Sequence, residues 1–94
     1  MRIISQDGKV DLPYELVSIS THARNSWQVI ARPLTDAERL FCVMGEYSTE
    51  EKAKKAMEML RMEFGNFAET SSTNGNYFAF DYPKLFRFPQ DSDV

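Results

Sequence analysis

The strongest structural signal in this sequence is an amphipathic helix that follows Ser48. The run Ser48-Thr-Glu-Glu51 has the spacing of a capping box. In this motif the serine hydroxyl accepts a hydrogen bond from an unpaired backbone N–H, and the Glu51 side chain accepts one from the N–H of the cap residue. Gly65 is expected to stop the helix. The pattern therefore predicts a helix over about residues 49–64. Its buried stripe, about 80° wide at ~100° per residue, consists of Ala53, Ala56, Met57, Leu60 and Phe64.

Segments that alternate with period two surround this helix. Strands are expected at residues 1–5, 14–21, 27–32 and 40–47 before it, and at 77–82 after it. Residues 10–12 fit a continuation of the first hairpin, and residues 84–88 fit one more edge strand. Gly45 is expected to mark a β-bulge, and residues 35–38 fit either one helical turn or a loop. Short turns between consecutive strands favour antiparallel pairing. We predict an α+β fold, with an antiparallel sheet of about four to six strands in the order β-β-β-β-α-β and the helix on one face.

The size and composition of the chain restrict its class. With 94 residues it is expected to be a single domain whose last few residues, 90–94, are frayed. A hydrophobic content of 43% predicts a packed core, and 13% aromatic residues leave some rings for a surface or an assembly. With a formal charge of −3, the chain lacks the excess of positive charge with which proteins bind duplex nucleic acid. One cysteine, no leader and no long apolar run predict a cytoplasmic protein without a membrane span.

Catalytic and metal-binding motifs are not recognisable in the sequence. His22 is the only histidine and Cys42 the only cysteine, so no pair exists to start a zinc or iron site. The carboxylates of Asp7, Asp11 and Glu15 suit turns and solvated edges better than acid-base chemistry. No glycine-rich phosphate loop is present. We therefore expect that the protein is not an enzyme and uses no cofactor or metal.

Two methionines indicate an interface on the helix. At ~100° per residue, Met59 and Met62 fall away from the buried stripe. Flexible, polarizable methionine side chains on an outer face suit an adaptable contact. We expect an oligomer or partner interface at Met59 and Met62, most simply in a homodimer or a multiple of it. The alternative is that they are ordinary exposed apolar residues.

A mixture of guanidinium and aromatic groups suggests a ligand site. Aromatic rings stack on nucleobases, and arginine forms bidentate hydrogen bonds with phosphate oxygens. The alternative is that most of these rings belong to the core. The candidate ligand-binding residues are Arg24, Trp27, Arg32, Tyr77, Tyr82 and Arg87.

Three segments resemble short proteins encoded by phages and prophages of Gram-positive bacteria. These are Met1-Arg-Ile-Ile-Ser-Gln-Asp-Gly8 with Asp11-Leu-Pro-Tyr-Glu15, the helical run from Tyr47 to Arg61, and Phe88-Pro-Gln-Asp91, about a third of the chain in total. None of them is a catalytic motif, and no ligand-binding residue transfers by position. Small accessory phage proteins of this group often counter host immunity, so the resemblance implies an anti-defence protein in the host bacterial cytoplasm.

The resemblance leaves several functions open. The leading hypothesis is a protein similar to anti-Thoeris and anti-CBASS sponges, which sequester a cyclic nucleotide or cyclic ADP-ribose signal without cleaving it. The first alternative is a protein-binding inhibitor of a host defence nuclease, as in anti-CRISPR factors. The second is a phage regulatory or housekeeping protein. A sponge needs a concave basic-aromatic pocket, whereas an inhibitor needs a broad exposed patch.

Overall fold

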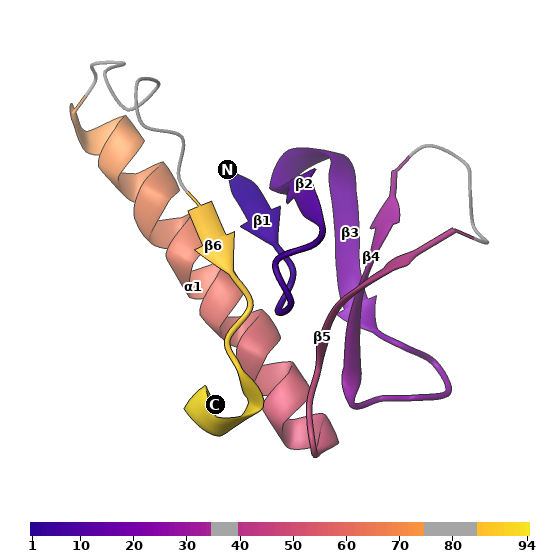
Figure 1. Ribbon diagram of the computed structural model, residues 1–94. Helices are drawn as coiled ribbons and strands as arrows, with labels where there is room; N and C mark the ends of the chain where they lie inside the picture. Colours follow the sequence, from indigo (N-terminus) through magenta and orange to yellow (C-terminus); the bar gives the residue numbers. More distant parts are fainter. Residues whose placement is uncertain (35–39, 75–84) are drawn as a thin grey trace.

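The computed structural model describes the backbone of residues 1–34, 40–74 and 85–94, and their side chains except those of 66–74. Within these residues, two short 3-10 helices, η1 (Tyr14–Leu16) and η3 (Asp91–Asp93), accompany the main elements. The combination of strands with one long helix confirms the predicted α+β class (Figure 1). In chain order the main elements are β1 (Arg2–Ile4), β2 (Asp11–Pro13), β3 (Val17–Thr21), β4 (Gln28–Pro33), β5 (Cys42–Glu46), α1 (Glu50–Asn74) and β6 (Leu85–Arg87).

The strands form two three-stranded sheets, where we expected one sheet. The first has the order β2-β1-β6, with β1 antiparallel to β2 and parallel to β6. The second is the antiparallel meander β3-β4-β5. The break between them lies at Pro13, which ends β2. The strand predicted over residues 14–21 is observed only from Val17 to Thr21, because its first three residues form η1. A parallel β1–β6 pair requires a long crossover, which α1 provides.

A bulge in β5 occurs where Gly45 predicted it. Val29 pairs with Gly45 but Ile30 pairs with Val43, so the register shifts between them. A Cβ atom on residue 45 would lie 2.8 Å from Cε2 and Oη of Tyr47. Glycine is therefore required here because the Tyr47 ring packs directly on the backbone.

The prediction that Ser48 caps helix α1 is wrong by one residue. The helix begins at Glu50, and the backbone N–H of Lys52 donates to Thr49 Oγ1 at 3.1 Å. Thr49 is thus the N-cap. Ser48 instead donates its backbone N–H to Asp91 Oδ1 at 2.7 Å, a contact with the C-terminal segment that local spacing does not reveal.

The predicted C-terminal end of the helix is also wrong. Helix α1 continues through Gly65 to Asn74. Gly65 does not adopt positive φ, and a Cβ there would meet nothing within 4 Å. An isolated helical glycine costs only about 1 kcal/mol relative to alanine, which the surrounding helix tolerates.

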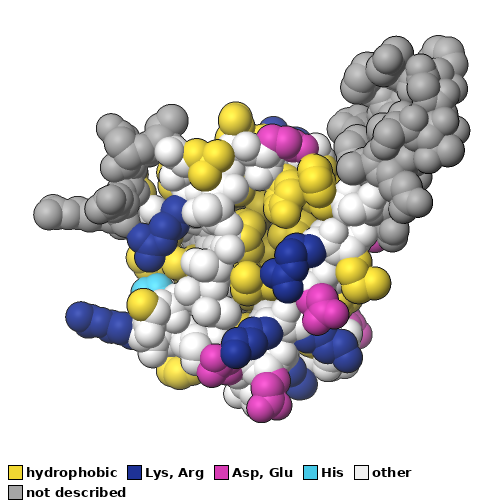
Figure 2. All heavy atoms as spheres, turned by 180° about the vertical axis from the view of Figure 1, so that it is seen from behind, with side chains coloured by type: hydrophobic (Ala, Val, Ile, Leu, Met, Phe, Trp, Pro, Cys, Tyr) yellow, Lys and Arg dark blue, Asp and Glu magenta, His cyan; other side chains and the backbone are white. Residues whose placement is uncertain are grey.

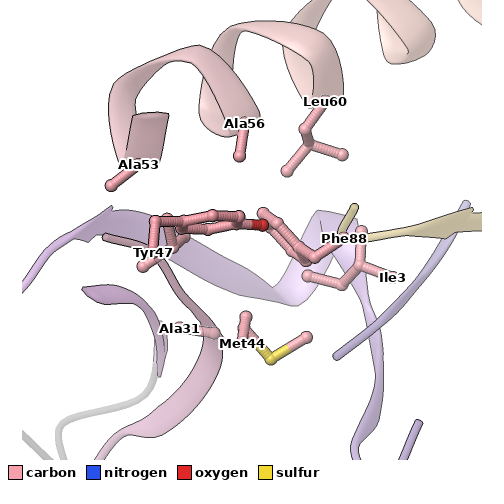
Figure 3. Close-up of a cluster of buried hydrophobic side chains, with 9 residues drawn as sticks. Ile3, Ala31, Met44, Tyr47, Ala53, Ala56, Leu60 and Phe88 are labelled. Carbon is pink, nitrogen blue, oxygen red and sulfur yellow. The ribbon is translucent and has the colours of Figure 1, made fainter. Parts of the chain in front are cut away.

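One hydrophobic core joins the helix to both sheets. Figure 3 shows Ala53, Ala56 and Leu60 of α1 on one side of the Tyr47 and Phe88 rings. The opposite side of these rings is covered from the first sheet and the second sheet by Ile3, Ala31 and Met44. Leu60 is 1% exposed, which confirms that it lies at the centre of the buried stripe.

The C-terminal residues, expected to be frayed, are held against the helix. Asp91 binds both the Ser48 amide and the Lys52 side chain, whose Nζ lies 3.4 Å from Asp91 Oδ2. The amide of Ser48 and the charge of Lys52 hold the pKa of the Asp91 carboxyl below its usual value. Val94 packs against the core. Two of our predictions, the 77–82 strand and the turn at residues 35–38, lie outside the described residues. No described helix has the length and apolar character needed to cross a bilayer.

Candidate functional site

One face of the second sheet carries a cluster of aromatic and basic side chains. Val29 and Ala31 of β4 point into the core that α1 covers. Because side chains alternate along a strand, Ile30 and Arg32 point to the opposite face, which we call the outer face. Ser20 of β3 and Val43 of β5 flank Ile30 in the paired strands, so the outer face extends across all three strands.

Phe41 is the central aromatic residue of the outer face. Its ring centroid lies 5.6 Å from Arg32 Cζ and 5.2 Å from the centroid of the His22 ring. His22 pairs with Gln28, two residues beyond Ile30 in the direction away from Arg32. The Phe41 ring therefore reaches across Ile30, which is fully buried although it points to the outer face. The guanidinium above the ring forms a cation–π contact.

His22 is oriented by the turn between β3 and β4. Its Nδ1 accepts the backbone N–H groups of Arg24 and Asn25, each at 3.1 Å. In the neutral ring the proton is therefore on Nε2, which is the nitrogen left to donate a hydrogen bond. The turn thus holds the imidazole beside Phe41 with a defined donor.

Exposed apolar side chains border this cluster where β4 ends and β5 begins. Leu34 and Leu40 are 62% and 64% exposed, and Phe41 and Val43 are 41% and 39% exposed. We call these four residues the β4–β5 patch. Exposed apolar side chains that gather in one place mark interaction surfaces more often than scattered ones do.

The four predicted ligand-binding residues that the structure describes do not converge on one pocket within the protomer. Arg24 and Trp27 both lie in the connection between β3 and β4, and Trp27 is 41% exposed. Arg32 lies at the other end of β4, on the outer face beside Phe41. Arg87 belongs to β6 in the first sheet, where its Nη2 donates to the Gln6 carbonyl at 3.4 Å.

Tyr77 and Tyr82, the two remaining candidates, lie outside the described residues. Two residues of the site were missed: Phe41 and His22. The alternation that places Phe41 and Val43 on one side of β5 was the available signal for Phe41. Nothing in the local sequence indicates His22, because its position depends on strand pairing.

The methionines predicted to form an interface lie on the outer side of α1. Met62 is 63% exposed, while Met59 is half-buried. Both line a shallow hollow of about 250 Å³ whose other lining residues are Glu51, Lys54, Lys55 and Glu58. Apolar contact area surrounded by both signs of charge is chemically suited to a protein partner.

The described residues include no group of three His, Cys, Asp or Glu side chains that could hold a metal ion. Cys42 is a half-buried free thiol. Comparison with known proteins gives no match: no protein-family model fits the sequence, and neither a curated protein nor a solved structure is similar to it. The ligand or partner must therefore be inferred from this chain's own surface.

Proposed function

We propose that this protein is a non-catalytic phage accessory protein that inhibits a host defence nuclease by binding it through the β4–β5 patch. The observation that carries the proposal is the exposure of 39–64% of four large apolar side chains: Leu34 directly after β4, and Leu40, Phe41 and Val43 around the start of β5. The resemblance of the N-terminal and helical segments to phage proteins supplies the anti-defence context. The same context makes the host bacterial cytoplasm the proposed location.

The chemistry of the patch favours a protein over a small ligand. Leu34, Leu40, Phe41 and Val43 offer apolar contact area, and Arg32 adds a guanidinium held next to an aromatic ring. Aromatic and arginine side chains surrounded by other apolar contacts are typical of binding hot spots. The hollow that Val43 lines is formed with Gln6, Asp7 and residues 44–46, and neither Arg32 nor Phe41 lines it. A partner with a broad surface can contact the patch without needing a pocket.

The test is binding to purified defence nucleases, tried one by one by calorimetry, together with phage survival in cells that carry each nuclease. Phe41→Ala should weaken binding to the affected nuclease by about 2 kcal/mol, as for a hot-spot aromatic residue. Leu85→Ala removes a similarly exposed side chain, 56% accessible, on β6 and serves as the matched control. The inhibitor proposal fails if no nuclease binds the wild type, or if Phe41→Ala and Leu85→Ala bind equally well.

Sequestration of a cyclic nucleotide or cyclic ADP-ribose signal is the second candidate. It is favoured by the contact of Arg32 and His22 with the Phe41 ring. The ring would stack on a base, the guanidinium would meet a phosphate, and His22 Nε2 would donate a further bond. Trp27 at the hairpin, and Arg87 from a second protomer, would complete a pocket only in a homo-oligomer.

Release of intact ligand separates this candidate from the first. The protein would be incubated with a panel of cyclic nucleotides and cyclic ADP-ribose isomers, washed, and denatured, and the released compound would be identified by mass spectrometry. Arg32→Lys keeps the charge but removes the planar fork, so affinity should fall by about 1–3 kcal/mol. Recovery of a cleaved compound would indicate an enzyme, and recovery of none would leave the nuclease inhibitor.

A further inference from the structure

The outer edge of β3 is open to pairing. In the second sheet β3 is a terminal strand, and among the described residues only β4 pairs with it. An edge strand presents a row of main-chain N–H and C=O groups that can accept another strand. The edge of β3 is therefore a template for an added polypeptide.

The register of β3 identifies which groups point outward. His22 N–H bonds to the Gln28 carbonyl, and Leu34 N–H bonds to the Leu16 carbonyl. Hydrogen-bonded pairs alternate along an antiparallel ladder, so Ser18 and Ser20 also direct their main-chain groups toward β4. The outward-facing residues are consequently Val17, Ile19 and Thr21.

A hollow of about 320 Å³ lies between this strand and helix α1. Its volume is far larger than the ~30 Å³ that one water molecule occupies in the liquid, so it can accommodate side chains. Figure 2 shows hydrophobic side chains gathered in a depression beside the helix, with Lys or Arg side chains near it. The lining residues are Tyr14, Val17, Ser18, Ile19, Met57, Leu60 and Arg61.

Arg61 is the only charged residue among those lining the hollow. It is exposed, and within the described parts of the chain it forms no hydrogen bond or ion pair. A guanidinium beside an apolar hollow favours an occupant that brings a carboxylate. A second copy of this chain paired edge to edge about a two-fold axis would bring another Arg61 to the same interface and no acidic lining residue. The charge therefore disfavours a second copy as the occupant.

We propose that the groove between β3 and α1 binds an extended segment of a partner protein as a fourth strand of the second sheet. The main chain of the segment pairs with Val17, Ile19 and Thr21. Its alternate apolar side chains enter the hollow against Met57, and an acidic side chain or a C-terminal carboxylate meets Arg61. This is recognition by strand addition, in which the backbone provides affinity and alternate side chains provide specificity. It uses a surface different from the β4–β5 patch.

The test begins with a display library of random linear nonapeptides selected on the full-length protein. We expect enrichment of peptides in which apolar residues alternate and at least one acidic group is present. Selection on Arg61→Glu should exchange the acidic preference for a basic one, and a synthesised acidic peptide should bind this variant about tenfold more weakly. Lys9→Glu, the same change of charge in the exposed β1–β2 connection, should leave the preference unchanged. Absence of an enriched alternating pattern, or an acidic preference that survives Arg61→Glu, would overturn the proposal.

Hydrogen exchange then locates the bound peptide. The amides of Val17, Ile19 and Thr21 should exchange more slowly in the complex. A peptide whose main-chain N–H groups facing β3 are methylated cannot donate these hydrogen bonds, so it should no longer bind. Equal binding of the N-methylated peptide would rule out strand addition. If these amides are already protected without peptide, and increasingly so at higher protein concentration as a dimer forms, the occupant is a second copy and the proposal is wrong. Melting curves of Arg61→Glu and Lys9→Glu check that both variants are folded.

Discussion

Replacement of Tyr47 by phenylalanine tests how the C-terminal segment is attached to the core. Tyr47 is 4% exposed and donates its hydroxyl to the Pro89 carbonyl at 2.9 Å. The same carbonyl also accepts Gln6 Nε2 at 3.1 Å, so it keeps one partner in the variant. A lost hydrogen bond that leaves its acceptor satisfied belongs at the low end of the usual range. We therefore expect Tyr47→Phe to lower the free energy of unfolding by about 0.5–1 kcal/mol at neutral pH.

The pH dependence of this difference gives a second, independent signature. Burial, and then the negative charge of Asp91, raises the pKa of Tyr47 to about 12. In the unfolded chain the phenol titrates near its ordinary value of 10.0. Since the folded pKa is the higher one, the contribution of Tyr47 to stability is fully present below pH 10 and is lost as the pH rises from 10 toward 12. The variant has no phenol to titrate at this position and so has no such loss, and the advantage of the wild type should shrink above pH 10.

The measurement is urea denaturation of both proteins at a series of pH values from neutral to about 11.5, monitored by circular dichroism. The other ionisable groups are common to both proteins, so their contributions cancel in the difference. A constant gap across the series would refute the assignment of a raised pKa to Tyr47. A loss of several kcal/mol at neutral pH would refute the claim that Gln6 keeps the Pro89 carbonyl satisfied.

Two further predictions concern helix α1. Thr49→Ala removes the N-cap and should lower stability by about 1 kcal/mol in thermal or chemical denaturation. Ser48→Ala should cost less, because it keeps the backbone N–H bond to Asp91 and removes only the weaker side-chain bond. A larger loss in Ser48→Ala would contradict the observed cap. Self-association through the outer helix face predicts that light scattering detects an oligomer that Met59→Lys with Met62→Lys dissociates, while Leu85→Lys on β6 does not. A wild type that is monomeric at micromolar concentration would reject this interface.

The candidate site was only partly accessible to sequence reasoning. Arg32 could be proposed because its chemistry suits phosphate, and Phe41 could be placed on the same side as Val43 by alternation. The contacts of Phe41 with Arg32 and with His22 depend on strand register, which brings together residues about ten to twenty positions apart. Arg32 stands near Trp27 in the sequence but lies at the other end of β4, and Arg87 belongs to the first sheet. Proximity in sequence therefore does not predict membership of one site.

Local patterns in the sequence determined the α+β class, the position of most strands, the buried stripe of α1 and the bulge at Gly45. Each of these depends on side chains a few residues apart, where spacing and backbone preference act directly. The tertiary structure decided the rest: the division into two sheets, the shift of the cap from Ser48 to Thr49, and the ordering of the C-terminal segment. These features depend on long-range partners, as when Asp91 captures the Ser48 amide from 43 residues away. Such a bond gains its free energy only after the core has brought its two ends together, so no local pattern encodes it.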